Sequence, residues 1–119
     1  MGYNVTQKTI NMNERMNSSQ SSNLVALINI QPGAVVSRTL VDKKAGTVTL
    51  FAFDKDEGLS EHTAPYDAFL HVLEGEAEVK VAGKKQLVQS GSYIIMPANA
   101  PHQVRATEPL KVLLTMIRG

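Results

Sequence analysis

The chain has 119 residues, a formal net charge of +1 and no cysteine. This length suits one domain, the balanced charge gives no sign of a nucleic-acid partner, and the lack of cysteine excludes disulfides, thiolate metal sites and iron–sulfur clusters. No apolar run is long enough to span a membrane, and residues 1–8 lack the apolar core of a secretion signal, so we expect a cytoplasmic protein without a membrane partner.

The first 23 residues form a polar arm that is rich in Asn and Ser, and we expect it to be only partly ordered. From residue 24 onward, short apolar runs alternate with turns, and β-branched residues are frequent. The runs cover residues 24–30, 35–41, 47–53, 68–73, 76–81, 86–88, 93–96, 102–107 and 110–117. Strands this short must close on one another to bury an inner face, so residues 24–119 are expected to form a single all-β barrel or two-sheet jelly roll.

His102 begins a strand in which residues alternate between two faces. Val104 and Ala106 share its face, while Gln103 and Arg105 take the other. Because the partners of His102 are apolar, the pattern predicts that this ring points into the barrel. An inward histidine needs a hydrogen bond, a ligand or a wet opening.

A second histidine, His62, follows the turn at residues 54–58 and has Ala64 on its expected face. Alanines beside both histidines would leave open volume around the rings, as a ligand site requires. His71 alternates with Ala68 and is expected on the outer face, where it would contact solvent or a second subunit. We therefore leave His71 out of the candidate site.

The two histidine segments resemble the two signature motifs of the cupins, and the resemblance covers about residues 32–117. In the first motif, His62 matches the first histidine and Gly75 the closing glycine, while Ala64 and Ala68 stand where a second histidine and a glutamate are usual. In the second motif, Gly91, Pro97 and His102 match, while Asn99 and Ala106 replace a glycine and an asparagine. The chain resembles in particular a bacterial and archaeal subgroup of small cupins.

The resemblance implies a cupin-type double-stranded β-helix, or jelly-roll barrel, with a short N-terminal arm and a homodimeric assembly. The apolar run at residues 24–28 is a candidate contributor to the dimer interface. The metal set of the family is incomplete here, because two of its four usual ligands are alanine. A divalent Zn, Ni or Fe ion would be held loosely by His62 and His102, with water or Asp67 completing the set.

The leading hypothesis is a protein that binds a small polar or anionic molecule between His62 and His102, in a cup that Ala64, Ala68 and Tyr93 also line. The residues leave open whether the protein is an enzyme. A metal-dependent oxygenase or isomerase that uses the same histidines is the first alternative, and a dimerising or sensor barrel without catalysis is the second.

Overall fold

The computed structural model describes residues 8–11 and 19–118, which contain ten β-strands and one short 3₁₀ turn. The elements are β1 (Lys8–Asn11), η1 (Val25–Leu27), β2 (Ala34–Lys43), β3 (Gly46–Phe53), β4 (Gly58–His62), β5 (Asp67–Glu74), β6 (Glu76–Val81), β7 (Lys84–Gln89), β8 (Tyr93–Met96), β9 (His102–Ala106) and β10 (Leu110–Ile117). The predicted all-β class is confirmed.

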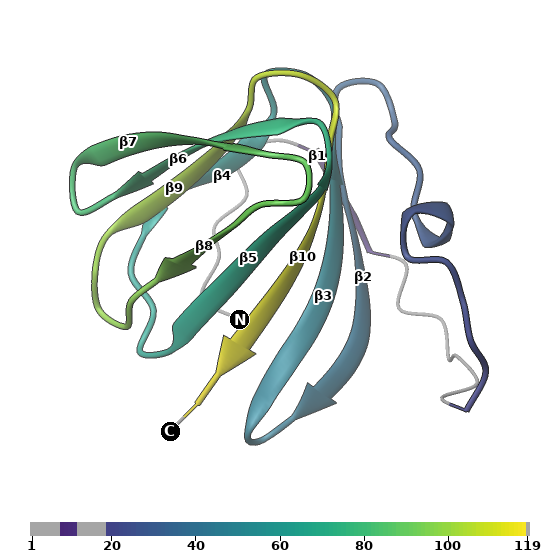
Figure 1. The fold of residues 1–119 in the computed structure, drawn as a ribbon, viewed down its shortest axis with the longest axis horizontal. Helices are drawn as coiled ribbons and strands as arrows, with labels where there is room; N and C mark the ends of the chain where they lie inside the picture. The colour runs from purple at the N-terminus through teal and green to yellow at the C-terminus, as the bar shows by residue number, and fades with distance from the viewer. Residues whose placement is uncertain (1–7, 12–18, 119) are drawn as a thin grey trace.

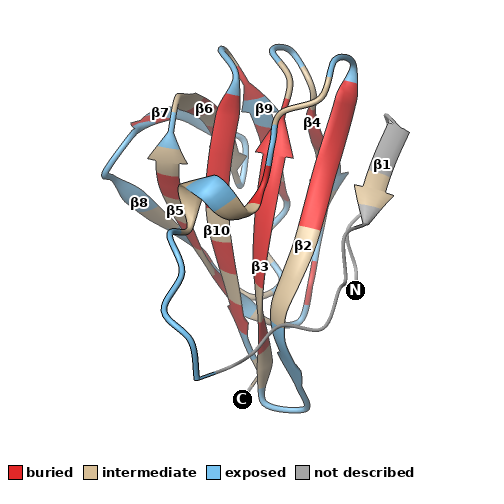
Figure 2. Cartoon of the chain, turned by 90° about the vertical axis from the view of Figure 1, so that its right-hand side faces the viewer, coloured by how far each residue is buried: buried red, intermediate tan, exposed pale blue. Residues whose placement is uncertain are grey.

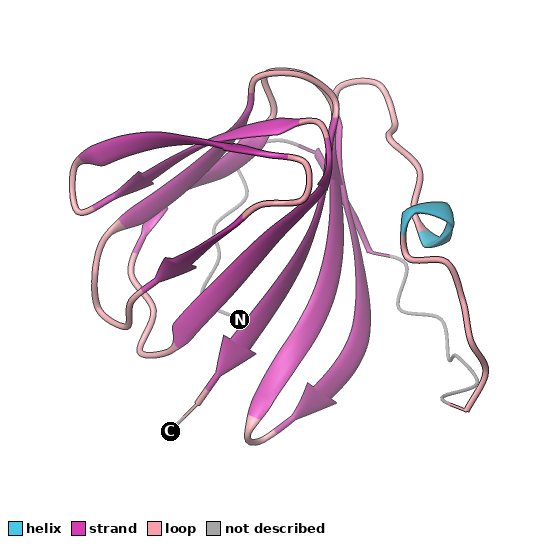
Figure 3. Cartoon of the chain, in the orientation of Figure 1, coloured by secondary structure: helices cyan, strands magenta, loops and turns pink. Residues whose placement is uncertain are grey.

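The strands form two sheets that face each other across the core (Figure 1; Figure 3). The larger sheet has six strands in the order β1-β2-β3-β10-β5-β8, and the smaller sheet has four in the order β4-β9-β6-β7. All pairings are antiparallel except that of β1 with β2. This arrangement is the jelly roll that the spacing of the runs predicted.

Alternation along each strand decides what enters the core. On β10, the inward residues Leu110, Val112, Leu114 and Met116 belong to a single apolar cluster. Inward residues of both sheets take part in that cluster, including Phe51 from β3 and Val104 from β9. The two inner faces therefore pack on one core, and residues on these faces share one interior.

The predicted strand at residues 24–30 is wrong. Residues 25–27 form the turn η1, which lies against the outer face of the six-stranded sheet (Figure 2). This outer face is itself apolar at Leu50, Ala52 and Leu113, and η1 belongs to a second cluster that buries them. The carbonyl oxygen of Leu27 accepts a hydrogen bond from Arg38 at 2.8 Å, and that of Val25 accepts one from Lys111 at 2.9 Å. These two cations satisfy carbonyls that a short turn leaves without intrahelical partners.

Part of the N-terminal arm joins the sheet, because β1 pairs in parallel with the edge strand β2. The rest of the expected arm, residues 1–7 and 12–18, lies outside the described residues. Within the part of the chain that the structure describes, no helix is long and apolar enough to cross a membrane.

Candidate functional site

A β-bulge in β4 turns His62 toward the core. Leu59 pairs with Val104 and His62 pairs with His102, so Ser60 and Glu61 together oppose the single residue Gln103. Leu59 points into the core, and simple alternation over three residues would turn His62 outward. The extra residue of the bulge reverses this and puts His62 on the inner face.

His102 reaches the interior by regular alternation, as predicted. His102, Val104 and Ala106 are buried, while Gln103 is half-buried and Arg105 is exposed. The His102 ring has no exposed surface at all. A histidine in this position must find its polar partners within the protein or in a bound molecule.

The two imidazoles meet as neighbours across adjacent strands. Their ring centroids are 4.4 Å apart and the ring planes lie 73° from each other, an edge-to-face arrangement. Nδ1 of His62 lies 2.7 Å from the carbonyl oxygen of Ser60, and Nδ1 of His102 lies 3.0 Å from that of Ala100. Since a carbonyl oxygen only accepts, both Nδ1 atoms carry the proton. In the neutral rings, Nε2 is then the atom that accepts hydrogen bonds.

The surroundings favour the neutral form of His102. Burial lowers the pKa of His102 below its usual value of 6.5, and the charge on a protonated His62 lowers it further, while the hydrogen bond to Ala100 raises it in part. The net effect is a lowered pKa, so the ring is neutral at pH 7 and keeps its lone pair on Nε2.

The alanines that replace usual cupin ligands are buried. Ala64 and Ala68 are each 2% exposed. The loop after β8 is hydrogen-bonded to the first motif at Ala64, where the Asn99 N–H donates to the Ala64 carbonyl oxygen at 2.8 Å. The two motifs therefore meet through main-chain contacts as well as through the histidines.

The structure places three other predicted residues away from the histidine pair. Tyr93 is 58% exposed and stacks on Phe69, at 4.8 Å between ring centroids. Its neighbour Ile94 packs against the core, so Tyr93 faces outward from the six-stranded sheet. Asp67 is exposed, and its Oδ1 accepts a hydrogen bond from the Ala98 N–H at 2.9 Å. His71 pairs with Tyr93 on that outer face, as expected for a residue outside the site.

The donor set does not fit a tightly held metal ion. Among the described residues, no group of three or more histidine and acidic side chains is arranged to hold one. Two imidazoles supply half of a tetrahedral set, and alanine occupies the positions of the other two usual ligands. Asp67, the carboxylate expected to complete the set, instead accepts the hydrogen bond from the chain at Ala98.

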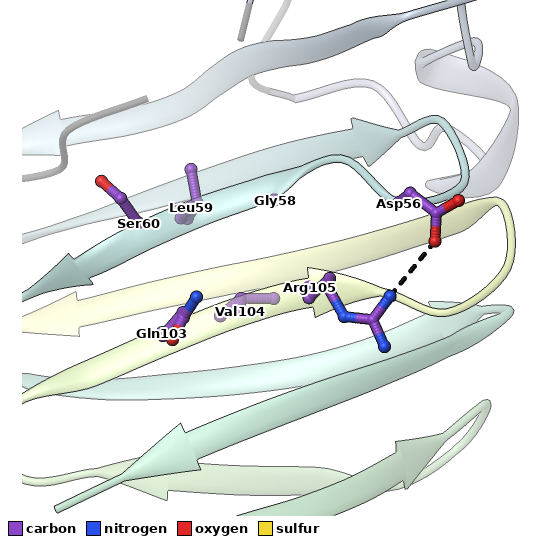
Figure 4. A pocket seen from close by; sticks show the side chains of 7 residues that line it. All are labelled: Asp56, Gly58, Leu59, Ser60, Gln103, Val104 and Arg105. Carbon is purple, nitrogen blue, oxygen red and sulfur yellow. Dashed lines mark hydrogen bonds and ion pairs between the residues drawn. The ribbon is translucent and has the colours of Figure 1, made fainter. Parts of the chain in front are cut away.

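A pocket of about 140 Å³ lies along β4 and β9, beside the bulge (Figure 4). The Asp56–Arg105 ion pair, at 3.1 Å, lies at one end of it. The lining residues are Asp56, Gly58, Leu59, Ser60, Gln103, Val104 and Arg105. Neither histidine lines this pocket, so it is not the predicted cup around the rings, which stays a prediction.

The sequence reasoning missed the two carbonyl oxygens that orient the rings. In each case the acceptor belongs to the residue two positions before the histidine, Ser60 for His62 and Ala100 for His102. Every residue type has a backbone carbonyl, so the sequence gives no signal for these acceptors. That each acceptor lies two residues before its histidine can be seen only in the structure.

The comparisons with known proteins agree with this fold. The family model of the cupin domain matches residues 49–117, more than half of the chain. A conserved protein of unknown function from Streptococcus pyogenes is 29% identical, with 89% of this chain and 93% of that chain covered and a TM-score of 0.84.

Two further solved structures are similar. A cupin 2 conserved barrel domain protein from Leptotrichia buccalis is 40% identical, with 82% of this chain but 47% of that chain covered and a TM-score of 0.79. A cupin superfamily protein from Desulfitobacterium hafniense is 21% identical, with 91% and 99% covered and a TM-score of 0.82. No curated protein matches the sequence. The matched motifs, the two-sheet barrel and the family model together place this chain in the cupin family.

Proposed function

We propose that this cupin binds a small polar molecule inside the barrel through His62 and His102. The observation that supports the proposal is the pair itself: two imidazoles from different motifs lie 4.4 Å apart in the interior. Each ring is oriented by a main-chain carbonyl. An oriented, neutral imidazole such as that of His102 is suited to accept hydrogen bonds from a ligand or to act as a general base near neutral pH.

The first step of recognition is the acceptance of a ligand O–H or N–H by an imidazole Nε2. His102 is the stronger candidate for this role because its lowered pKa keeps it neutral. If a protonated ligand transfers its proton, the two adjacent rings would share a single added charge, since a second one would be repelled at this distance. Binding without reaction and proton abstraction are both compatible with this geometry.

The test compares His62→Gln and His102→Gln with the parent in a thermal-shift screen against small polar and anionic compounds. A compound at about 100 times its Kd stabilises the parent by about 2.7 kcal/mol, which both variants should lose. His71→Gln is the matched control, since His71 lies on the outer face and should keep the shift. Equal shifts in the parent and both site variants would contradict the proposal.

Metal analysis of protein purified without an affinity tag separates this function from the metal-dependent alternative. Under our proposal, ligand shifts persist after treatment with a chelator. Stoichiometric metal in the parent that disappears in both site variants would favour a metal-dependent cupin enzyme instead.

A further inference from the structure

The loop that joins β8 to β9, residues 97–101, supplies the carbonyl oxygen that orients His102. Within it, the Ala100 N–H donates to the Pro97 carbonyl oxygen at 3.3 Å, and Asn99 has a φ of +67°. These features are those of a type II turn with asparagine at its third position. The oxygen that lies 3.0 Å from His102 Nδ1 belongs to Ala100, the last residue of this turn. The position of the turn therefore determines where the acceptor for the ring lies.

Each main-chain N–H of this loop has a hydrogen-bond partner. Besides the bond within the turn, the Ala98 N–H donates to Asp67 Oδ1 at 2.9 Å, and the Asn99 N–H donates to the Ala64 carbonyl oxygen at 2.8 Å. The two prolines of the loop have no N–H to donate. Two of the three bonds thus join the turn to the start of β5 and the segment before it (Figure 1). Asp67 is the only side chain among these partners, so it is the partner that a substitution can remove.

The sheet fixes the position from which the Asp67 carboxylate reaches the turn. Asp67 is the exposed first residue of β5, and it pairs with Ile117 of β10. The next residue, Ala68, pairs with Met96, which immediately precedes the loop. The carboxylate therefore lies beside the point where the loop begins. A hydrogen bond from a main-chain N–H to a carboxylate is stronger than one to a neutral acceptor.

We propose that Asp67 is a positioning residue for His102, which acts through the turn at residues 97–100 and keeps the ring proton on Nδ1. The contacts run from the Asp67 carboxylate to the Ala98 N–H, through the turn, and from the Ala100 carbonyl oxygen to the ring. The inference rests on the function proposed above, in which Nε2 of His102 accepts a hydrogen bond from the ligand. This role differs from the metal ligation that the sequence suggested for Asp67.

The tautomer of His102 depends on where the Ala100 carbonyl oxygen lies. The His102 side chain has no exposed surface, so its Nδ1–H cannot turn to bulk water instead. A neutral imidazole has a single N–H, and the hydrogen bond made by one nitrogen decides which nitrogen carries the proton. Displacement of the Ala100 oxygen lengthens or bends the bond that favours the Nδ1–H form. More molecules then carry the proton on Nε2, which in that form cannot accept a hydrogen bond from a ligand.

The test determines the His102 tautomer from the nitrogen chemical shifts of its imidazole in the full chain, without a ligand. The spectra are recorded at about pH 7.5, where the ring is neutral. We expect the Nδ1–H form to dominate in the parent. Asp67→Ala should raise the population of the Nε2–H form about fivefold, which corresponds to the loss of one hydrogen bond. Asp67→Asn should stay close to the parent, because its amide oxygen can accept the same N–H.

Asp54→Ala is the matched control. Asp54 also accepts a hydrogen bond from a main-chain N–H, that of Gly33, at 2.7 Å. It lies in the turn between β3 and β4, which is bonded to the Ala106 end of β9 rather than to the His102 end. Its removal should lower the Tm and leave the tautomer of His102 unchanged. A variant that only loosens the fold would then not reproduce the signal expected of Asp67→Ala.

Several results would overturn the inference. If the parent carries its proton on Nε2, or if Asp67→Ala keeps the tautomer of the parent, the carboxylate does not position the ring. If Asp54→Ala shifts the tautomer equally, the effect is a general loss of stability. If Asp67→Asn shifts it as far as Asp67→Ala, the charge acts rather than the hydrogen bond to Ala98. Because these spectra need no ligand, their outcome is independent of the thermal-shift screen that tests the proposed function.

Discussion

Asn99 occupies a backbone conformation that most residues avoid. Its φ is +67°, in the left-handed region, and it stands where the second cupin motif usually has a glycine. Asparagine tolerates this region better than other residues with a side chain, because its short amide bonds locally with the backbone. Asparagine in place of the usual glycine can therefore keep the loop conformation in which residue 99 donates a hydrogen bond to Ala64.

Replacing Asn99 tests this explanation. Asn99→Ala should lower the free energy of unfolding by about 1 kcal/mol, because alanine pays the full cost of the left-handed conformation. Asn99→Gly should remain close to the parent, since glycine adopts this φ freely. Urea unfolding measures both. An alanine variant as stable as the glycine variant would show that the conformation at this position is not what selects asparagine.

His102 makes stability depend on pH. Its folded pKa lies below the unfolded value of 6.5, so between these two values the unfolded chain binds more protons. Stability therefore rises with pH through this window, is complete above about pH 6.5, and is lost as the pH falls toward the folded pKa. Urea unfolding at about pH 7.5 and about pH 5.5 should show a smaller loss in His102→Gln than in the parent. The same loss in both proteins would mean that His102 does not control it.

At the scale of elements, the β6–β7 hairpin contains a local conflict. Its two turn residues, Ala82 and Gly83, have φ values of +49° and +82°. A two-residue turn with both values positive matches the twist of the strands, and Asn-Gly is its preferred sequence. Alanine at the first position is strained in this conformation.

Ala82→Asn should relieve that strain. We expect it to stabilise the protein by about 1 kcal/mol, which corresponds to a rise in Tm of about 4–8 °C. Ala45→Asn is the control, because Ala45 lies in the β2–β3 turn and is not among the described residues with positive φ. Calorimetry that finds equal effects for both variants would contradict the explanation.

Element boundaries also explain where sequence reasoning failed. The run at residues 24–30 is apolar because it covers the outer face of a sheet. A strand with one face in the core would be apolar as well. Composition alone does not separate these cases. Conversely, the alternation of Glu76 to Val81 predicted β6 correctly, since one face of that strand meets the core and the other meets solvent.

At the scale of the whole molecule, the described residues cover only part of the outer face of the six-stranded sheet. The row that contains Leu50 and Leu113 packs beneath the segment at η1. The next row runs across five paired strands, and its two end residues, Val41 and Ile95, are exposed. It consists of Val41, Val48, Thr115, Phe69 and Ile95. A groove of about 260 Å³ lies at the ends of β2, β3 and β10 beside it.

This uncovered face is where we expect the homodimer, which stays a prediction. Four large hydrophobic residues on it are strongly exposed: Val41 at 41%, Tyr93 at 58%, Ile95 at 53% and Ile117 at 58%. An apolar area of this kind marks an interaction surface when it is contiguous. The run at residues 24–28, which we expected to contribute to the dimer interface, instead packs on the outer face of the sheet in its own chain.

Sedimentation of two matched variants tests the interface. Ile95→Glu should convert a dimeric parent to a monomer, because a charge would be buried without a partner. Leu87→Glu is the control, since Leu87 is 60% exposed but lies on β7 of the other sheet. A monomeric parent, or dissociation caused by both variants alike, would contradict this interface.

The sequence by itself determined most of the strands after residue 34, the inward direction of His102 and the outward direction of His71, because alternation is a local property of each strand. It also carried the motif spacing that identifies the family. Only the tertiary structure decided that His62 faces inward, since that depends on a bulge whose extra residue is defined by pairing with β9.

The tertiary structure likewise decided that Tyr93 lies outside the barrel, and that the Thr47 and Thr49 hydroxyls are buried without a hydrogen-bond partner among the described residues. The physical reason is the same in each case. A side chain's face and its hydrogen bonds depend on register between strands that are distant in sequence, and no local pattern records that register.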